Sequence, residues 1–223
     1  MTRGVFITGT DTGIGKTRVS CALLRALRVE GICAAGMKPV ASGCAPTARG
    51  LRNDDAEALR VAAARDDEYA LVNPYALAEP IAPHLAAQID GIEVELTTIK
   101  KAYQKLCDRA DFVVVEGVGG WAVPLSPTLM QDDLVRALKL PVILVVAVKL
   151  GCINHTLLSA RAIDGDGCHL VGWIANMVEP NFSAAAQTLM TLAERVPAPC
   201  LATLDWNAEQ LKIDPALRRA LSI

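Results

Sequence analysis

VFITGTDTGIGKT, residues 5–17, joins a short apolar run to a glycine-rich loop that ends in a lysine and a threonine. The run from Val5 to Thr8 has the composition of a buried β-strand, and the apolar residues after Lys16 recur at helical spacing as far as Glu30. Strand, loop and helix in this order predict a P-loop, which binds phosphate groups. An incidental glycine-rich turn is the weaker interpretation, because all three parts agree.

The residue types of this loop suit a triphosphate and a metal. Gly9, Gly13 and Gly15 allow backbone N–H groups to turn toward phosphate oxygens, and the following helix start adds positive potential. Lys16 supplies a mobile cation and Thr17 a hydroxyl for Mg²⁺. The loop has five residues between its first glycine and the Gly-Lys pair, where the usual pattern has four.

Composition limits the other possibilities. A chain of 223 residues with 52% hydrophobic residues is long enough to bury a substantial core and short enough to form one domain, residues 1–223. A net charge of −2 without a basic stripe argues against nucleic acid as a partner. The longest apolar run, residues 141–148, has the length of a buried strand rather than of a membrane span.

The cysteines and the N-terminus indicate a cytoplasmic protein. Seven cysteines are scattered along the chain with no C-x-x-C pair, so reduced thiols are expected and a zinc site is not. The first strand begins within a few residues of Met1, which leaves no room for a signal peptide.

Predicted strands and helices alternate along the whole chain, which predicts an α/β fold of the P-loop NTPase type. Its central β-sheet is expected to be mostly parallel, with helices on both faces. The further strands are expected at 32–37, 112–115, 141–148, 170–175 and 200–204, and the further helices at 56–64, 93–110, 132–138, 152–162, 182–195 and 215–221. Residues 66–88 are rich in loop signals and proline, and they are expected to form an extended wall over the substrate or a simple connection.

Charged residues at strand ends are the main candidates for function. Lys38 follows one predicted strand, and Glu116 closes the apolar strand before Gly117. The carboxyl ends of parallel strands form the ligand-binding edge of such sheets, so both residues are candidates for the site. Asp54 and Asp55 precede a predicted helix, where capping the helix is the simpler role and contact with a metal the alternative.

Two later positions leave similar alternatives open. The helix start after Gly151 has free N–H groups suited to an anion, although Asn154 is also an ordinary N-cap residue. Asn176 follows the strand at 170–175, and its amide suits N6 and N7 of adenine. The Asn-Lys-x-Asp pattern of guanine-specific GTPases is missing there, so ATP is the expected nucleotide.

The segments as a set resemble the dethiobiotin synthetase family. The resemblance rests on Gly9 to Thr17, Lys38 to Gly43, Leu51 to Asn53 with Asp55, Asn73 to Tyr75, Glu79-Pro80, Glu116-Gly117 with Gly119-Gly120, Val148 to His155, Gly172-Trp173 and Asn176. Partitioning-type P-loop ATPases, which act as nucleotide-switched dimers, are the alternative. They carry a signature lysine where this sequence has Asp11.

The resemblance implies an ATP- and Mg²⁺-dependent ligase of biotin biosynthesis that acts as a homodimer. Its substrates would be 7,8-diaminopelargonic acid and CO₂ or bicarbonate. One amine would take up CO₂ as a carbamate, ATP would convert the carbamate into a carbamic-phosphoric anhydride, and the second amine would close the ureido ring.

The resemblance also implies roles for particular residues. Lys16 and Lys38 would be catalytic, and Mg²⁺ would lie among Thr17, Asp55 and Glu116. The other nucleotide contacts would come from Thr12, Gly13, Ile14, Gly15, Gly117, Val118, Gly119, Asn176, Leu204, Asp205 and Trp206. The substrate contacts would come from Thr12, Ser42 and Gly119, and from Cys152, Ile153 and Asn154 of the partner subunit.

Two positions depart from the family pattern, and both belong to the expected nucleotide site. Gly13 stands where some members have an acidic residue, and Asp205 replaces a proline that is common after the last strand.

Overall fold

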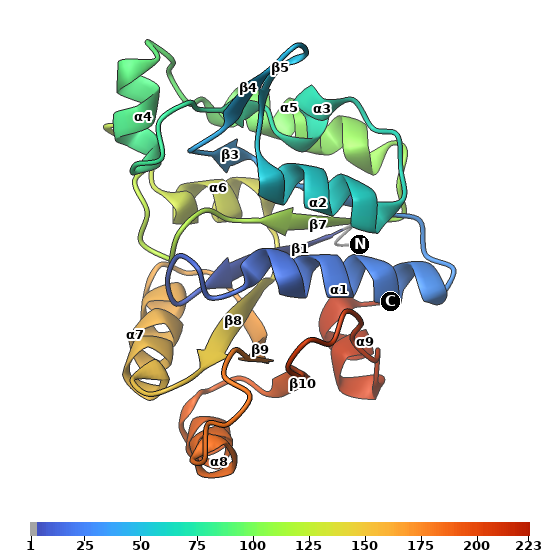
Figure 1. Cartoon of the computed structure of the whole chain (residues 1–223), viewed down its shortest axis with the longest axis vertical. Helices are drawn as coiled ribbons and strands as arrows, with labels where there is room; N and C mark the ends of the chain where they lie inside the picture. Colours follow the sequence, from blue (N-terminus) through green and yellow to red (C-terminus); the bar gives the residue numbers. More distant parts are fainter. Residues whose placement is uncertain (1–3) are drawn as a thin grey trace.

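A computed structural model describes residues 4–223 and contains a six-stranded parallel sheet (Figure 1). The strand order is β10-β9-β8-β1-β7-β2, and every neighbouring pair is parallel. The strands are β1 (Gly4–Gly9), β2 (Ala34–Met37), β7 (Phe112–Glu116), β8 (Val142–Val148), β9 (Leu170–Met177) and β10 (Cys200–Leu204). The expected parallel sheet is therefore confirmed, and β1 lies inside it with β7 and β8 as neighbours.

Helices cover both faces of the sheet because alternate residues of each strand point to opposite sides. Val114 of β7 belongs to a core shared with α1, α2 and α9, whereas Val113 and Val115 belong to a core shared with α5 to α8. The first group is α1 (Lys16–Val29), α2 (Asp54–Ala63) and α9 (Pro215–Leu221). The second group is α5 (Leu96–Cys107), α6 (Gln131–Leu138), α7 (Cys152–Gly165) and α8 (Ala185–Arg195). These helices match the predicted ranges to within a few residues at each end.

The segment between β2 and α5 differs from its prediction. Residues 66–88 are not simply extended, because they contain two short helices and a strand that pairs with β3. Pro83 starts one of these helices, where a proline ring is well suited to the first position. The additional elements are β3 (Val40–Ala41), the hairpin of β4 (Ala45–Thr47) and β5 (Gly50–Arg52), α3 (Tyr69–Val72), β6 (Tyr75–Ala76) and α4 (Pro83–Ile89).

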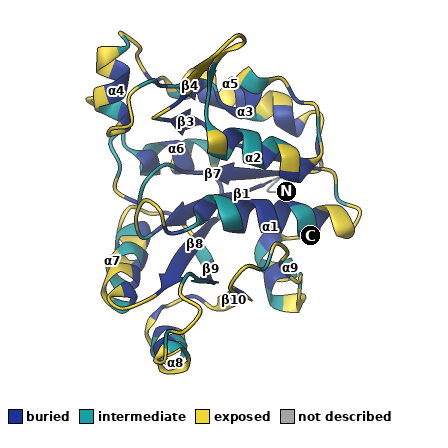
Figure 2. Ribbon diagram, viewed as in Figure 1, coloured by how far each residue is buried: buried dark blue, intermediate teal, exposed yellow. Residues whose placement is uncertain are grey.

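The strands β1, β7 and β8 in the middle of the sheet are buried along their whole length (Figure 2). All seven cysteines are free thiols, and five of them are buried. No helix within residues 4–223 is long and apolar enough to cross a membrane.

The three tryptophans have different environments. Trp173 in β9 is fully buried, and Trp206 after β10 is half-exposed. Trp121 is buried, and its indole N–H donates to the carboxylate of Asp166 at 2.7 Å. Trp121 thereby ties the loop after β7 to the carboxyl end of α7.

Candidate active site

The loop between β1 and α1 has the backbone of a phosphate site. Gly13 and Gly15 adopt φ values of +72° and +87°, in the left-handed region that favours glycine. Gly15 is the N-cap of α1, and no side chain caps this helix start. The first N–H groups of α1 therefore remain available to an anion.

Lys16 is folded back onto this loop. Its Nζ donates to the backbone carbonyl of Asp11 at 2.9 Å, and the side chain is largely buried. Burial, together with the nearby charge of Lys38, lowers the pKa of Lys16 to about 8. The carboxylate of Asp11 accepts from the N–H of Thr12 at 2.7 Å, so Asp11 contributes to the shape of the loop.

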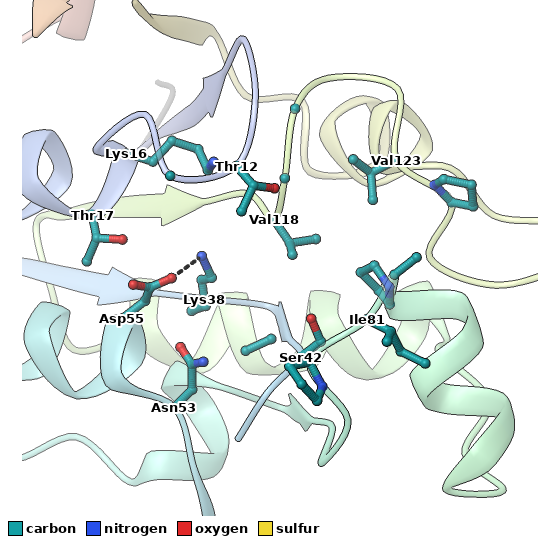
Figure 3. Close-up of a pocket in the computed structure, with 18 of the residues that line it drawn as sticks. Thr12, Lys16, Thr17, Lys38, Ser42, Asn53, Asp55, Ile81, Val118 and Val123 are labelled. Carbon is teal, nitrogen blue, oxygen red and sulfur yellow. Dashed lines mark hydrogen bonds and ion pairs between the residues drawn. The ribbon is translucent and has the colours of Figure 1, made fainter. Parts of the chain in front are cut away.

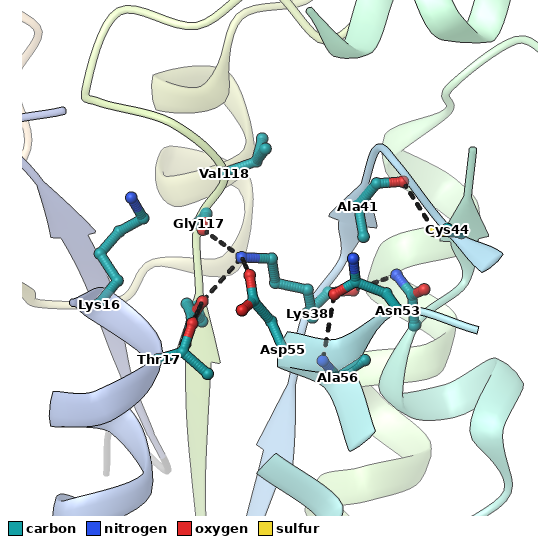
Figure 4. A network of polar contacts seen from close by, with 12 residues as sticks. Lys16, Thr17, Lys38, Ala41, Cys44, Asn53, Asp55, Ala56, Gly117 and Val118 are labelled. Atoms are coloured by element: carbon teal, nitrogen blue, oxygen red, sulfur yellow. Dashed lines mark hydrogen bonds and ion pairs between the residues drawn. The ribbon is translucent and has the colours of Figure 1, made fainter. Parts of the chain in front are cut away.

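Lys38 joins the ends of two strands in a buried cluster of charges (Figure 4). Its Nζ lies 2.7 Å from Oε1 of Glu116 and 2.9 Å from Oδ2 of Asp55, and it also donates to the carbonyl of Gly117 at 3.1 Å. Burial alone would lower the pKa of Lys38, but the two carboxylates outweigh it and raise that pKa. Burial likewise opposes ionisation of Asp55, yet Lys38 lowers the pKa of its carboxyl group. Lys38 is thus a fixed cation.

Oxygen ligands for a metal gather beside this lysine. The hydroxyl of Thr17 donates to Oε1 of Glu116 at 2.8 Å. Glu116 is fully buried, and its Oε2 has no hydrogen-bond partner within residues 4–223. A buried carboxylate oxygen without a partner, next to a hydroxyl and the second carboxylate of Asp55, suits a hard cation such as Mg²⁺.

The structure distinguishes between the two aspartates at the start of α2. Asn53 is the N-cap, because its side chain accepts from the N–H of Ala56 at 3.2 Å. Asp54 is exposed, whereas Asp55 reaches Lys38. Asp55 therefore belongs both to the first turn of α2 and to the charge cluster around Lys38.

These groups open into a cavity of about 850 Å³ between the phosphate loop and the segment before α4 (Figure 3). Thr12, Ser42 and Gly119, the residues predicted to contact the substrate, are among its lining residues. Asn53 and Val123 also line it, and sequence reasoning did not name them as site residues. Pro80 to Pro83 also line it, and they belong to the segment 66–88 that the sequence predicts as a wall over the substrate or a simple connection.

Gln131 is a further residue that sequence reasoning missed. This buried side chain at the start of α6 accepts from the N–H of Val118 at 2.8 Å and donates to the carbonyl of Gly120 at 2.7 Å. A Cβ atom on Gly117 would lie 2.6 Å from its Oε1, so this glycine is needed for the close approach. Gln131 therefore shapes the loop after β7, and no local motif marks it.

The residues expected to contact the adenine base lie outside the lining of this cavity. Asn176 is buried, and its amide donates to the carbonyl of Ile14 at 2.8 Å. Leu204 is buried at the end of β10, whereas Asp205 and Trp206 are exposed. None of these four belongs to the lining of the 850 Å³ cavity among the described residues.

The start of α7 is also separate from that cavity. Cys152, Ile153 and Asn154 form its first turn and are not among the described lining residues. The alternative that Asn154 caps this helix is wrong, because Gly151 is the N-cap and Asn154 lies inside the helix. The left-handed φ of Gly151, +90°, starts the helix one turn earlier than that alternative required. A contribution of this turn to a partner's site stays a prediction.

Sheet order, phosphate loop and lysine cluster together define a P-loop nucleotide-binding protein. Solved structures that share this fold include the following two. Chloroplast FtsY from Physcomitrella patens aligns with a TM-score of 0.55 at 17% identity, over 99% of this chain and 65% of that chain. The MinC:MinD cell division protein complex of Aquifex aeolicus aligns at 0.55 and 11% identity, over 98% of this chain and 85% of that chain. At these identities the likeness concerns the fold alone.

The family follows from closer relatives. A family model described as an AAA domain matches residues 3–212. The ATP-dependent dethiobiotin synthetase BioD of Xanthomonas oryzae pv. oryzae (strain PXO99A) is 53% identical over 92% of this chain and 91% of its own. The protein of the same name from Pseudomonas aeruginosa (strain LESB58) is 55% identical over 88% and 86%. The chain belongs to the dethiobiotin synthetase family, the ATP-dependent ligases of biotin biosynthesis.

Proposed function

We propose that this chain closes the ureido ring of dethiobiotin from 7,8-diaminopelargonic acid, CO₂ and ATP. The observation that carries the proposal is the Lys38 ammonium, fixed between Glu116 and Asp55 beside a phosphate loop and an open cavity. The names of the relatives support the product and the use of ATP.

The proposed reaction has three steps. One amine of the diamine attacks CO₂, which forms an N–C bond, a carbamate and a released proton. A carbamate oxygen then attacks the γ-phosphorus of ATP, and the bond to ADP breaks. The second amine attacks the carbonyl carbon of this carbamic-phosphoric anhydride, phosphate leaves, and the amine proton passes to phosphate or solvent.

The residues fit these steps as sources of charge and position. Phosphoryl transfer needs mainly alignment and stabilisation of negative charge. Lys16 would hold the β- and γ-phosphates, and Lys38 would bridge the carbamate and the γ-phosphate. Because its carboxylate neighbours raise the pKa of Lys38, this residue acts as a cation and not as a general base.

Mg²⁺ would be held by Thr17, Asp55 and Glu116, whose oxygens already converge. When bound, the ion supplies neutralisation of the negative charge on the phosphate oxygens. The buried Oε2 of Glu116, without a hydrogen-bond partner among the described residues, supports this assignment.

The diamine would lie in the 850 Å³ cavity against Thr12, Ser42 and Gly119. Its carboxylate would meet the uncapped first turn of α7, Cys152 to Asn154, supplied by the partner in a homodimer. Adenine would lie toward Asn176 and the stretch 204–206. Seven free thiols support a cytoplasmic location.

The test is dethiobiotin formation from the diamine, bicarbonate, Mg²⁺ and ATP, with ADP followed in parallel. We expect ADP release to depend on the diamine, and Lys16→Ala and Lys38→Ala each to lower turnover by about a hundredfold or more. Lys101→Ala, at an exposed lysine of α5, is the matched control. ATP hydrolysis that ignores the diamine but responds to DNA or a partner protein would favour a partitioning-type ATPase instead.

A further inference from the structure

Arg18 occupies the end of the phosphate loop that faces the proposed base site. It is the third residue of α1 and directly follows Thr17. Its guanidinium donates to Oδ1 of Asn176 and to the backbone carbonyls of Met177 (3.4 Å), Asp205 and Ala208 (3.0 Å). One side chain thus engages four acceptors, two at the end of β9 and two in the segment after β10.

The amide of Asn176 is held in one orientation by two different neighbours. Its Nδ2 donates to the carbonyl of Ile14 at 2.8 Å, while its Oδ1 accepts from Arg18. Flipping the amide would set Nδ2 against the guanidinium and Oδ1 against a carbonyl, so the flipped form has no favourable partner. A Cβ on Gly15 would lie 2.2 Å from Nδ2, which places this amide directly on the phosphate loop.

This arrangement matters for reading a purine. Adenine differs from hypoxanthine, the base of ITP, by an exocyclic amine that needs an acceptor. The acceptors at this edge, including Oδ1 of Asn176, already bind a cationic donor. Such charge-assisted bonds are roughly twice as strong as neutral ones, so an incoming amine competes poorly for them.

We propose that Arg18 is a specificity-determining residue that prevents the enzyme from reading the exocyclic amine of the nucleobase. The inference rests on the base position proposed above, between Asn176 and residues 204–206. Affinity then comes mainly from the triphosphate, which ATP and ITP share.

The test compares dissociation constants of ATP and ITP for the full-length protein with Mg²⁺, by isothermal titration calorimetry. The wild-type protein is expected to bind both within about twofold. Arg18→Met frees the acceptors, and we expect it to prefer ATP over ITP by about three- to tenfold, the effect of one hydrogen bond. The loss of positive charge beside the phosphates affects ATP and ITP alike, so it cancels in the ratio of their dissociation constants.

Arg25→Met is the matched control, since Arg25 lies on the same helix and, within residues 4–223, its side chain donates only to the carbonyl of Glu209, at 3.1 Å. Its ATP to ITP ratio should stay at the wild-type value. A wild-type preference for ATP of tenfold or more overturns the inference, and so does an unchanged ratio in a folded Arg18→Met protein. If Arg18→Met does not fold, the ATP to ITP ratios of the wild-type protein and of Arg18→Lys test the inference instead. If neither nucleotide binds the wild-type protein, the proposed function itself fails.

Discussion

Lys38 is the residue on which the charge balance of the site depends. Its side chain and that of Glu116 are almost completely buried, at 4% and 0% exposure. Lys38→Met would leave the Glu116 carboxylate buried without its cation. We expect the free energy of unfolding, measured with urea, to fall by about 3–5 kcal/mol, as for other broken buried pairs.

A double variant separates this charge effect from lost packing. Glu116→Gln in the Lys38→Met background removes the uncompensated charge and should restore part of the stability, while activity stays lost. If the double variant were less stable than Lys38→Met, packing rather than charge would account for the loss.

Lys16 should make nucleotide binding dependent on pH. Its pKa is lowered to about 8 by burial and by Lys38, and bound phosphates would raise it again. Between about pH 8 and pH 10, binding of ATP should therefore take up a proton, whereas near pH 6.5 it should not. The unfolded chain binds more protons in this higher window, so the contribution of Lys16 to stability grows as the pH rises.

Calorimetry in two buffers with different ionisation enthalpies measures this uptake. Most of a proton is expected at about pH 8.5, and Lys16→Met should abolish it. Equal apparent enthalpies in both buffers would show that Lys16 is already protonated before ATP binds.

Individual residues of the site differ in how far the sequence could identify them. Lys38 and Glu116 follow apolar strands, and strand ends converge at one edge of a parallel sheet. Asp55 was ambiguous, because a carboxylate in the first turn of a helix is already stabilised by the helix dipole. Arg18 carries no local signal, since its partners lie far away in the sequence, and Gln131 belongs to no motif although Val118 and Gly120 are 13 and 11 residues away.

Among the elements, the loop after β7 depends on α6 for its shape. Gln131→Leu removes the acceptor for the N–H of Val118 and the amide donor for the carbonyl of Gly120, which keeps the longer bond from the Thr8 hydroxyl at 3.4 Å. We expect the free energy of unfolding to fall by about 1–3 kcal/mol, and kcat/KM for the diamine to fall with it. Both quantities can be measured on the same preparation.

The control is Gln104→Leu on α5, an exposed glutamine whose side-chain amide, among the described residues, bonds only the side chain of Asp108. This variant should behave like the wild-type protein. Equal losses in both variants would mean that the hydrogen bonds of Gln131 have no special importance.

Long elements were predictable and short ones were not. The central strands and main helices have clear periodicity over many residues. Strands β3 and β6 have only two residues each, and they form because they pair with each other. Two residues are too few to show the alternation of apolar and polar residues that marks a strand. The prolines of this segment argued against a helix at α4. Its own proline, Pro83, occupies the first helical position, which accepts proline readily.

At the scale of the whole molecule, the proposed shared site allows subunit mixing. Asn154→Asp adds a carboxylate to the first turn of α7, which suits the helix dipole but repels the substrate carboxylate. Lys38→Ala and Asn154→Asp subunits should each be poorly active alone. Mixed dimers would contain one intact site, so an equal mixture should regain about a quarter of the wild-type activity.

Activity of the mixture is measured after the subunits have exchanged, and sedimentation gives the mass of the assembly. Mixing Lys38→Ala subunits with themselves under the same conditions is the control. Activity no greater than the mean of the two separate preparations would contradict a site shared between subunits.

The three tryptophans allow ligand binding to this protein to be followed by intrinsic fluorescence. Trp206 is half-exposed beside the proposed base position, Trp121 is a buried residue of the loop after β7, and Trp173 is fully buried in β9. We expect their emission wavelengths to differ, because Trp206 meets water, Trp121 bonds a carboxylate, and Trp173 meets the apolar core. A fluorescence spectrum can therefore follow the two ends of the site separately, with Trp173 as a constant internal reference and no added dye.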